Sequence, residues 1–560
     1  MNRIYKSVFN VHTGTWVAVQ ETAKSQGKKS VKSSIVSAVT DLKTSLAALA
    51  LASTGALLFL PSSAAHAVEI GSLFADNSKG TPASAGDPGD VAIGGGATTA
   101  SNSNVSGDVA VGGGSFASSG TNSSGALQRG VSVGYKASTY GGVAIGDSAG
   151  SGGKDVVSTA VGAGSTASGS ASIAIGSSKA NPTSATATNT VAIGNGASAS
   201  GENALAMGSS SSSSANGSIA IGISSLANQN NAIAIGVSSK ATQVNATAIG
   251  LSALADANRA TALGANSQAI AYSATAIGDR AVANTSDSIA IGSFATTSGS
   301  SGKGVAIGYN AKSVEGAIAI GESAYAESII GADGKAKISV AVGMESIAKG
   351  MDAAAFGTKA IAQSDFGTAV GNFANTSKRN ATAVGNAASA SGVSSSAFGN
   401  FSNATGSNAT AIGGGGLVGT FQGAQALADG ATAVGGNDVQ GAIASGKNAT
   451  AIGGQSQAVA ENAIAIGLGA QAKAKDSISI GTGNIVTGEG SGAIGDPTTV
   501  NGAGTYVYGN DNGTIDANNS GVFGNDNTIT GALDGVRVIG NTNTVICPRF
   551  NGQFKRLISC

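Results

Sequence analysis

A short motif that ends in glycine recurs every 14 residues through most of this 560-residue chain, and this period constrains the fold more than any other feature. The motif is x-A-[IVLMF]-G, whose first three residues we call the first, second and third positions. The spacing is held from Gly194 to Gly292, and two further blocks of the chain repeat it. A period this constant predicts a stack of similar coils rather than an ordinary globular core.

Each repeat contains two short stretches in which the residues alternate between two faces. In one unit, Ala197–Ala199 and Leu205–Met207 are separated by turn-forming residues at 200–203 and at Gly208. Because each stretch recurs 14 residues later, it must pair in parallel with its own copy, about 4.8 Å along the axis. We therefore predict an all-β chain folded as a parallel β-roll, or solenoid, with glycine where a Cβ would clash at the corner.

The second and third motif positions form two uniform columns that point to opposite sides of the strand. The third position is predicted to fill the interior as a core ladder: Ile193, Met207, Ile221, Ile235, Ile249, Leu263, Ile277 and Ile291. The second position is always small and is predicted to pack against another chain: Ala192, Ala206, Ala220, Ala234, Ala248, Ala262, Ala276 and Ala290. The reason is that both strand faces are apolar, whereas a single two-stranded roll covers only one of them.

The N-terminal segment has the pattern of an export signal. Leu46–Leu60 is an apolar run of fifteen residues, too short to span a bilayer comfortably, and the small residues of Ala65-His66-Ala67 follow it. This pattern predicts a signal peptide over residues 1–67, with cleavage between Ala67 and Val68.

The remaining composition excludes most enzymes. Both histidines lie within residues 1–67, and the two cysteines, Cys547 and Cys560, lie in the last fourteen residues. The sequence therefore predicts no catalytic residues, no metal site and no cofactor. Beyond residue 67 the chain has 23 basic and 28 acidic residues without basic runs, which argues against a nucleic-acid partner.

Two segments resemble known families. The opening MNRIYKSVFNVHTGTWVAVQETAKSQGKK resembles the extended signal peptide region of Gram-negative type V secretion substrates. Copies such as 287–292 (DSIAIG) and 217–222 (GSIAIG) resemble the YadA-like head of trimeric autotransporter adhesins. This resemblance implies a left-handed roll assembled as a homotrimer at the cell surface. It also implies a non-enzymatic adhesin that binds collagen, fibronectin, laminin or other bacteria, and it assigns no ligand-binding residue.

Two alternatives to an adhesin remain at this stage. The first is a structural spacer or biofilm and autoagglutination scaffold whose adhesive domain lies elsewhere. The second is a polysaccharide-acting solenoid enzyme, which would need carboxylates gathered on one face, whereas the acidic residues are scattered among the turns.

Departures from the 14-residue period divide the chain further. Three glycine spacings of 22 residues, at 112–134, 321–343 and 413–435, predict surface loops of about eight extra residues. Near the end, bulkier residues replace the alanines, and Asn follows each Gly, which predicts asparagine ladders along the axis. The expected parts are a signal peptide (1–67), an N-terminal segment (68–90), head repeats (91–495), Asn-rich head repeats (496–545) and an atypical tail (546–560).

The tail departs from the repeat in composition. It contains both cysteines and three basic residues, which indicates a frameshift product. The resemblance implies a neck, stalk and barrel anchor after the head, so we expect a truncated chain that is exported but stays in the periplasm. The alternative is a genuine cap, with Phe550 and Phe554 covering the last coil and a disulfide between Cys547 and Cys560.

Overall fold

The computed structural model describes most of the repeat region and short parts of the N-terminal segment. The described residues are 5–10, 15–20, 68–70, 83–87, 89–100, 107–121, 127–152, 157–300, 302–332, 334–415, 423–531 and 533–546. The whole apolar run Leu46–Leu60, the predicted cleavage residue Ala67 and the tail from Cys547 onward lie outside them. The chain divides into two compact units, residues 1–65 and 66–560.

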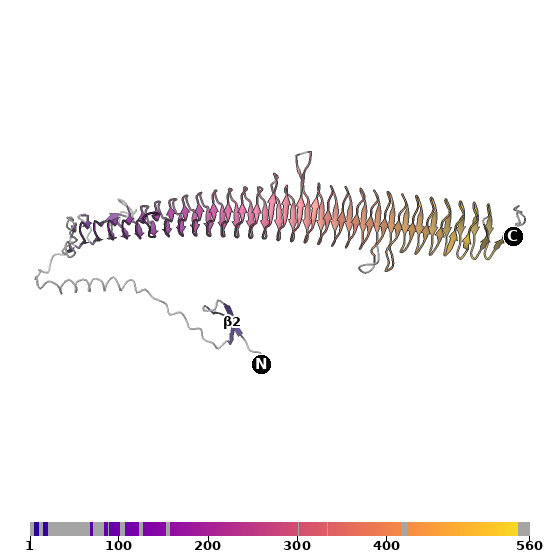
Figure 1. Cartoon of the computed structure of the whole chain (residues 1–560), viewed down its shortest axis with the longest axis horizontal. Helices are drawn as coiled ribbons and strands as arrows, with labels where there is room; N and C mark the ends of the chain where they lie inside the picture. The colour runs from indigo at the N-terminus through magenta and orange to yellow at the C-terminus, as the bar shows by residue number, and fades with distance from the viewer. Residues whose placement is uncertain are drawn as a thin grey trace. The chain divides into compact units, whose positions relative to one another are not determined.

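In the first unit, β1 (Tyr5–Asn10) and β2 (Thr15–Gln20) form an antiparallel pair. The second unit is a solenoid of short coils stacked in one row (Figure 1). Each regular coil supplies one strand to a first sheet and one strand to a second sheet, which agrees with the predicted two strands and two turns.

The first sheet contains 31 strands, nearly all of three residues with the motif's first, second and third positions. Its strands are β3 (Val68–Ile70), β4 (Val91–Ile93), β6 (Val109–Val111), β10 (Val131–Val133), β12 (Val143–Ile145), β14 (Thr159–Val161), β16 (Ile173–Ile175), β18 (Val191–Ile193), β20 (Leu205–Met207), β22 (Ile219–Ile221), β24 (Ile233–Ile235), β26 (Thr247–Ile249), β28 (Thr261–Leu263), β30 (Thr275–Ile277), β32 (Ile289–Ile291), β34 (Val305–Ile307), β36 (Ile318–Ile320), β40 (Val340–Val342), β42 (Ala354–Phe356), β44 (Thr368–Val370), β46 (Thr382–Val384), β48 (Ser396–Phe398), β50 (Thr410–Ile412), β52 (Thr432–Val434), β54 (Thr450–Ile452), β56 (Ile464–Ile466), β58 (Ile478–Ile480), β60 (Gly492–Ile494), β62 (Tyr506–Tyr508), β64 (Gly521–Phe523) and β66 (Arg537–Ile539).

The second sheet contains 28 strands, most of them of two residues. They are β5 (Thr98–Thr99), β7 (Phe116–Ser118), β11 (Ser138–Tyr140), β13 (Gly150–Ser151), β15 (Thr166–Ala167), β17 (Ser184–Ala185), β19 (Ser198–Ala199), β21 (Ser212–Ser213), β23 (Leu226–Ala227), β25 (Lys240–Ala241), β27 (Leu254–Ala255), β29 (Gln268–Ala269), β31 (Val282–Ala283), β33 (Thr296–Ser298), β35 (Lys312–Val314), β37 (Tyr325–Glu327), β41 (Ile347–Lys349), β43 (Ile361–Ala362), β45 (Asn375–Thr376), β47 (Ser389–Ala390), β49 (Asn403–Ala404), β51 (Gln425–Ala426), β53 (Ile443–Ala444), β55 (Gln457–Ala458), β57 (Gln471–Ala472), β59 (Ile485–Val486), β61 (Thr498–Val500) and β63 (Gly513–Ile515).

Successive strands of each sheet pair in parallel with like positions side by side. In the first sheet, for example, Ala220 pairs with Ala234, and Ala234 with Ala248. At the usual inter-strand spacing, 31 strands give the roll a length of about 145 Å. The predicted parallel solenoid of 14-residue repeats is therefore confirmed.

The motif glycine closes each strand because a side chain would collide with the next coil. Gly236 has φ of 134°, and a Cβ built on it would lie 2.3 Å from the carbonyl oxygen of Gly250. No real Cβ approaches another atom so closely, so the corner excludes even alanine. The structural reason predicted for the glycine column is confirmed.

The turns also follow a regular pattern, at half the repeat length. Ser238, Asn245 and Ser252 all have φ between 53° and 57°, and they lie seven residues apart at alternating corners. Ser and Asn are suited to these left-handed positions because their short polar side chains bond locally. Each 14-residue coil is thus closed by two turns of similar backbone conformation.

The enlarged glycine spacings contain antiparallel hairpins that leave the roll. In the spacing 321–343, β38 (Ile329–Ile330) pairs with β39 (Ala336–Lys337). In the spacing 112–134, β8 (Gly120–Thr121) pairs with β9 (Leu127–Gln128). The third insertion lies largely at 416–422, outside the described residues.

Toward the C-terminal end the coil becomes longer and its interior larger. Val486, Val500 and Ile515 replace alanine inside the roll. Two asparagine ladders run along this part, one between residues that directly follow the glycine and one inside the roll. In the inner ladder, Asn527 Nδ2 donates to Asn512 Oδ1 at 3.0 Å, and Asn543 Nδ2 donates to Asn527 Oδ1 at 2.9 Å. The predicted asparagine ladders are confirmed.

The last strands, β65 (Thr528–Thr530) and β67 (Thr544–Ile546), pair in parallel and continue the stack.

Candidate functional site

The alanine column forms the interior of the roll, which reverses the predicted assignment of the strand faces. Every second-position alanine of the predicted inter-chain ladder is fully buried: Ala192, Ala206, Ala220, Ala234, Ala248, Ala262, Ala276 and Ala290. They pack against alanines of the second sheet, such as Ala227 and Ala241. The two sheets lie too close together for larger groups, so the uniform smallness reflects packing within one chain and not contact between chains.

The third-position ladder, predicted to be the core, lies on the outside. Met207 and Leu263 are 40% and 42% exposed. The other members are half-buried: Ile193, Ile221, Ile235, Ile249, Ile277 and Ile291. The prediction of an interior column was wrong because the two residues that flank a second-position alanine point together to the opposite side.

The outer face of the first sheet is consequently an apolar surface along the whole roll. Its third position is apolar or aromatic in every strand from β4 to β66, and its first position is Val, Ile, Leu or Thr in most of them. Soluble monomers rarely expose a continuous apolar surface of this size, and such surfaces usually mark contacts with other molecules. We call this surface the apolar face.

The outer face of the second sheet has a different chemical character. Its outward positions in successive coils include Ser212, Leu226, Lys240, Leu254 and Gln268. Polar and charged groups interrupt the apolar ones, so water can solvate this face. The two faces therefore differ, and the apolar face alone needs a covering partner.

The corners of the roll carry cations beside aromatic rings. Arg259 lies 5.8 Å from the ring centre of Tyr272 and donates from Nη1 to its hydroxyl at 2.9 Å. Val244, Asn245 and Asn258 complete an open hollow of about 260 Å³ around this pair. A similar pair places Lys359 over Phe373 at 5.5 Å. Such pairs are worth about 0.5–1 kcal/mol at exposed sites, so they hold the corner side chains in place.

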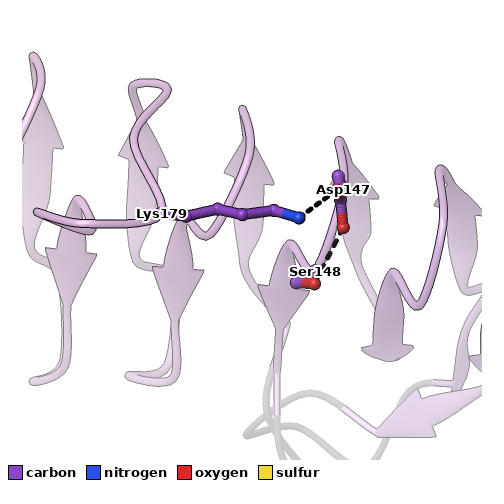
Figure 2. A network of polar contacts seen from close by, with 3 residues as sticks. All are labelled: Asp147, Ser148 and Lys179. Atoms are coloured by element: carbon purple, nitrogen blue, oxygen red, sulfur yellow. Dashed lines mark hydrogen bonds and ion pairs between the residues drawn. The ribbon is translucent and has the colours of Figure 1, made fainter.

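One corner contact crosses two coils. Lys179 forms an ion pair with Asp147, which also accepts a hydrogen bond from the Ser148 hydroxyl at 2.9 Å (Figure 2). The hydrogen bond from Lys179 is the main reason that the pKa of Asp147 is lowered. All three side chains are on the surface, where ion pairs contribute little to stability.

The hairpin at 329–337 presents apolar side chains to solvent. Ile329, Ile330 and the following Ile338 are exposed. At its base, the Tyr325 hydroxyl donates to Glu327 Oε2 at 2.7 Å, and burial together with this contact raises the pKa of Tyr325 to about 12. Sequence reasoning predicted an insertion here but not that it would be an ordered hairpin.

Two stacked carboxylates are buried near the N-terminal end of the roll. Asp90 Oδ1 accepts from the backbone nitrogens of Gly107 and Asp108, at 2.8 and 3.0 Å. Asp108 Oδ1 accepts from the backbone nitrogen of Gly130 at 2.7 Å and from the Ser119 hydroxyl. Burial raises the pKa of Asp108. Sequence reasoning missed this pair, which occupies a turn position held by Ser, Thr, Ala or Gly in later coils.

The described residues contain no group of three or more His, Cys, Asp or Glu placed to hold a metal ion. They also include no helix long and apolar enough to cross a membrane.

Comparison with known families agrees with this geometry. Residues 1–51 match the extended signal peptide of the type V secretion system, which supports export across the inner membrane. Repeats of the YadA head domain match at 158–178, 185–211, 213–239, 241–267, 269–295, 348–374, 362–388, 377–402, 390–415 and 444–470. A search among curated proteins finds no match.

The fold and the leader together define an exported protein whose described residues beyond 66 form a β-solenoid head. The repeated matches to the YadA head domain and the match to the extended signal peptide together support a YadA-like trimeric autotransporter adhesin. Heads of this family are typically non-enzymatic.

Proposed function

We propose that this chain is the head of a cell-surface adhesin that works as a homotrimer of left-handed rolls. The observation that carries the proposal is the apolar face, which runs from β4 to β66 and which no other described part of the chain covers. Three copies that turn this face toward a common axis would bury it completely. The trimer contact therefore lies on the first and third motif positions, and not on the alanine column.

The adhesive surface is then what remains outside: the outer face of the second sheet, the corners and the hairpins. We propose that these regions hold matrix proteins such as collagen, fibronectin or laminin, or the surfaces of other bacterial cells. Three chains that each repeat the same coil offer many copies of a weak contact, and linked weak contacts combine through effective concentration. Export is proposed to end with cleavage between Ala67 and Val68.

The assembly can be tested with residues 68–560 and two single variants of them, each with one Glu substitution on a different outer face. Ile235→Glu places a carboxylate on the apolar face, whereas Leu226→Glu places one on the outer face of the second sheet. Both residues are half-buried in the single chain. We expect sedimentation to give a trimer for the parent and for Leu226→Glu and a smaller species for Ile235→Glu, because a buried unpaired carboxylate is strongly destabilising. A stable folded parent monomer at micromolar concentration would refute the trimer.

The same trimer, applied to plates coated with matrix proteins or with bacterial cells, tests adhesion. Retention on at least one coating, lost on heat unfolding, supports the adhesin. Retention on none of them would favour the alternative function, a structural spacer or autoagglutination scaffold.

A further inference from the structure

Two coils interrupt the uniform composition of the apolar face, and they do so in the same way. From β3 to β58, the first position is Val, Ile, Leu or Thr in every strand except β42 and β48. In those two strands it is Ala354 and Ser396, and the third position is Phe356 and Phe398. The bulkiest third-position residues are thus paired with the smallest first-position residues.

The same pairing recurs beyond β58 in the wider coils. Phe523 shares its strand with Gly521. β62 departs from this pairing, because its first and third positions are both large, Tyr506 and Tyr508. The coincidence is therefore found in three strands, β42, β48 and β64, and not in one coil alone.

Exposure to solvent alone does not require a small first-position residue beside each Phe ring. Phe356 and Phe398 are 41% and 38% exposed in the single chain, and their first-position neighbours are only half-buried. An open surface would accept Val or Thr beside the ring, as elsewhere in the column. A small neighbour beside each Phe ring is what a packed layer requires, because added volume there would force the side chains apart.

Threefold symmetry supplies such a layer. If three copies turn the apolar face toward one axis, six columns surround it, and first and third positions alternate. Each third-position side chain then lies beside the first-position side chain of the next copy at the same height. A layer of three Phe and three Ala needs no more room than a layer of three Ile and three Val.

We propose that Phe356 and Phe398 pack over Ala354 and Ser396 of the neighbouring copy, and that these two layers favour the in-register trimer over slipped ones. This inference rests on the proposed homotrimer. Register needs such a device because a shift by one coil, about 4.8 Å, replaces most contacts of the face with nearly identical ones. A shifted copy would instead place Phe356 against Val340 or Thr368, where the layer has no room for it.

A chain with the two layers exchanged within their strands tests the contact. The variant carries Ala354→Phe, Phe356→Ala, Ser396→Phe and Phe398→Ser, so each strand keeps its composition. It remains complementary to itself, because a small third position then meets a large first position. In a mixed trimer, however, Phe meets Phe at one contact and a small residue meets a small residue at another.

The two chains, carrying tags of different mass, are co-expressed as residues 68–560 and their trimers are counted by native mass spectrometry. We expect each chain alone to form trimers and the mixed trimers to fall about tenfold below their statistical share, given the usual effect of overpacking. The matched control exchanges Thr368 with Val370 and Thr382 with Val384, residues of similar volume in the strands between the two layers. It should mix statistically with the parent.

Statistical mixing of the layer-exchanged chain would overturn the inference and show that each ring packs only on its own strand. Failure of that chain to trimerise alone, while the control chain does, would also overturn it, because self-complementarity is required. If the parent itself is not a trimer, the proposed assembly fails, and the parent sample alone reveals this.

Discussion

Replacing Ala234 by isoleucine tests the central structural result, that the alanine column is the interior of the roll. Ala234 is fully buried, lies between Ala220 and Ala248 in its ladder and packs in one cluster with Ala227 of the second sheet. Isoleucine adds three carbon atoms to a layer that holds only methyl groups, and the coils above and below restrict any shift. Overpacking costs about 1–3 kcal/mol in ordinary cores, and we expect about 3 kcal/mol here.

The assay is hydrogen exchange in residues 219–249 together with the guanidinium midpoint, because a repeat array does not unfold in a single step. The control is Ala265→Ile at the corner that carries Ile223 and Leu251 in preceding coils, and it should leave exchange unchanged. Unchanged protection from hydrogen exchange in Ala234→Ile would refute the assignment of the alanine column to the interior. The refutation would be stronger if Ile235→Ala increased exchange in the same coil of the single chain.

Two further predictions concern the corner and the buried carboxylates. Gly236→Ala should destabilise its coil by at least about 1 kcal/mol, because the added Cβ would meet the Gly250 carbonyl and because φ at this position is positive. The destabilisation should appear as faster hydrogen exchange around residues 236–250. Exchange at the parent rate would contradict this prediction. The raised pKa of Asp108 means that folding favours the protonated carboxyl, so the parent loses stability as this group ionises with rising pH. Asparagine cannot ionise. We therefore expect Asp108→Asn to stabilise the N-terminal coils increasingly, relative to the parent, as pH rises from about 4 to 7. The measurement is local hydrogen exchange across that range, and a difference independent of pH would contradict the assigned cause.

Much of this fold could be predicted because the period carries it. Constant spacing fixed the pairing of each strand with its own copy, and alternation fixed two strands per coil. The glycine column predicted corners that exclude a side chain, and the structure places Gly236 against the carbonyl of Gly250 as that reasoning requires. The asparagine ladder followed from the same logic, because a residue repeated at each coil lies above its own copy.

The direction of the strand faces could not be obtained from the period. In Ala232–Ile235 both faces are apolar, so alternation distinguishes two sides without saying which is inside. The size of the interior decides the question, and that size depends on how closely the two turns bring the sheets together. An interior of alanine means a roll so thin that isoleucine does not fit, whereas the reverse assignment needs a thicker one. The sequence did contain a signal for the correct assignment: the second position is always small, which indicates that the space inside the roll is too narrow for a larger side chain.

The thin interior also explains where this chain varies in sequence. Backbone pairing in the described roll joins each coil to its neighbours, and the interior accepts little besides Ala, Ser and Thr until the coils widen near residue 486. The apolar face is limited as well, because its outward positions are apolar or Thr in most strands. The corners have neither limit, and the same corner position accordingly holds Ser252, Arg280, Phe294 and Lys359 in different coils. Differences in binding between coils are therefore expected at the corners and hairpins, where side chains change without disturbing either packed surface.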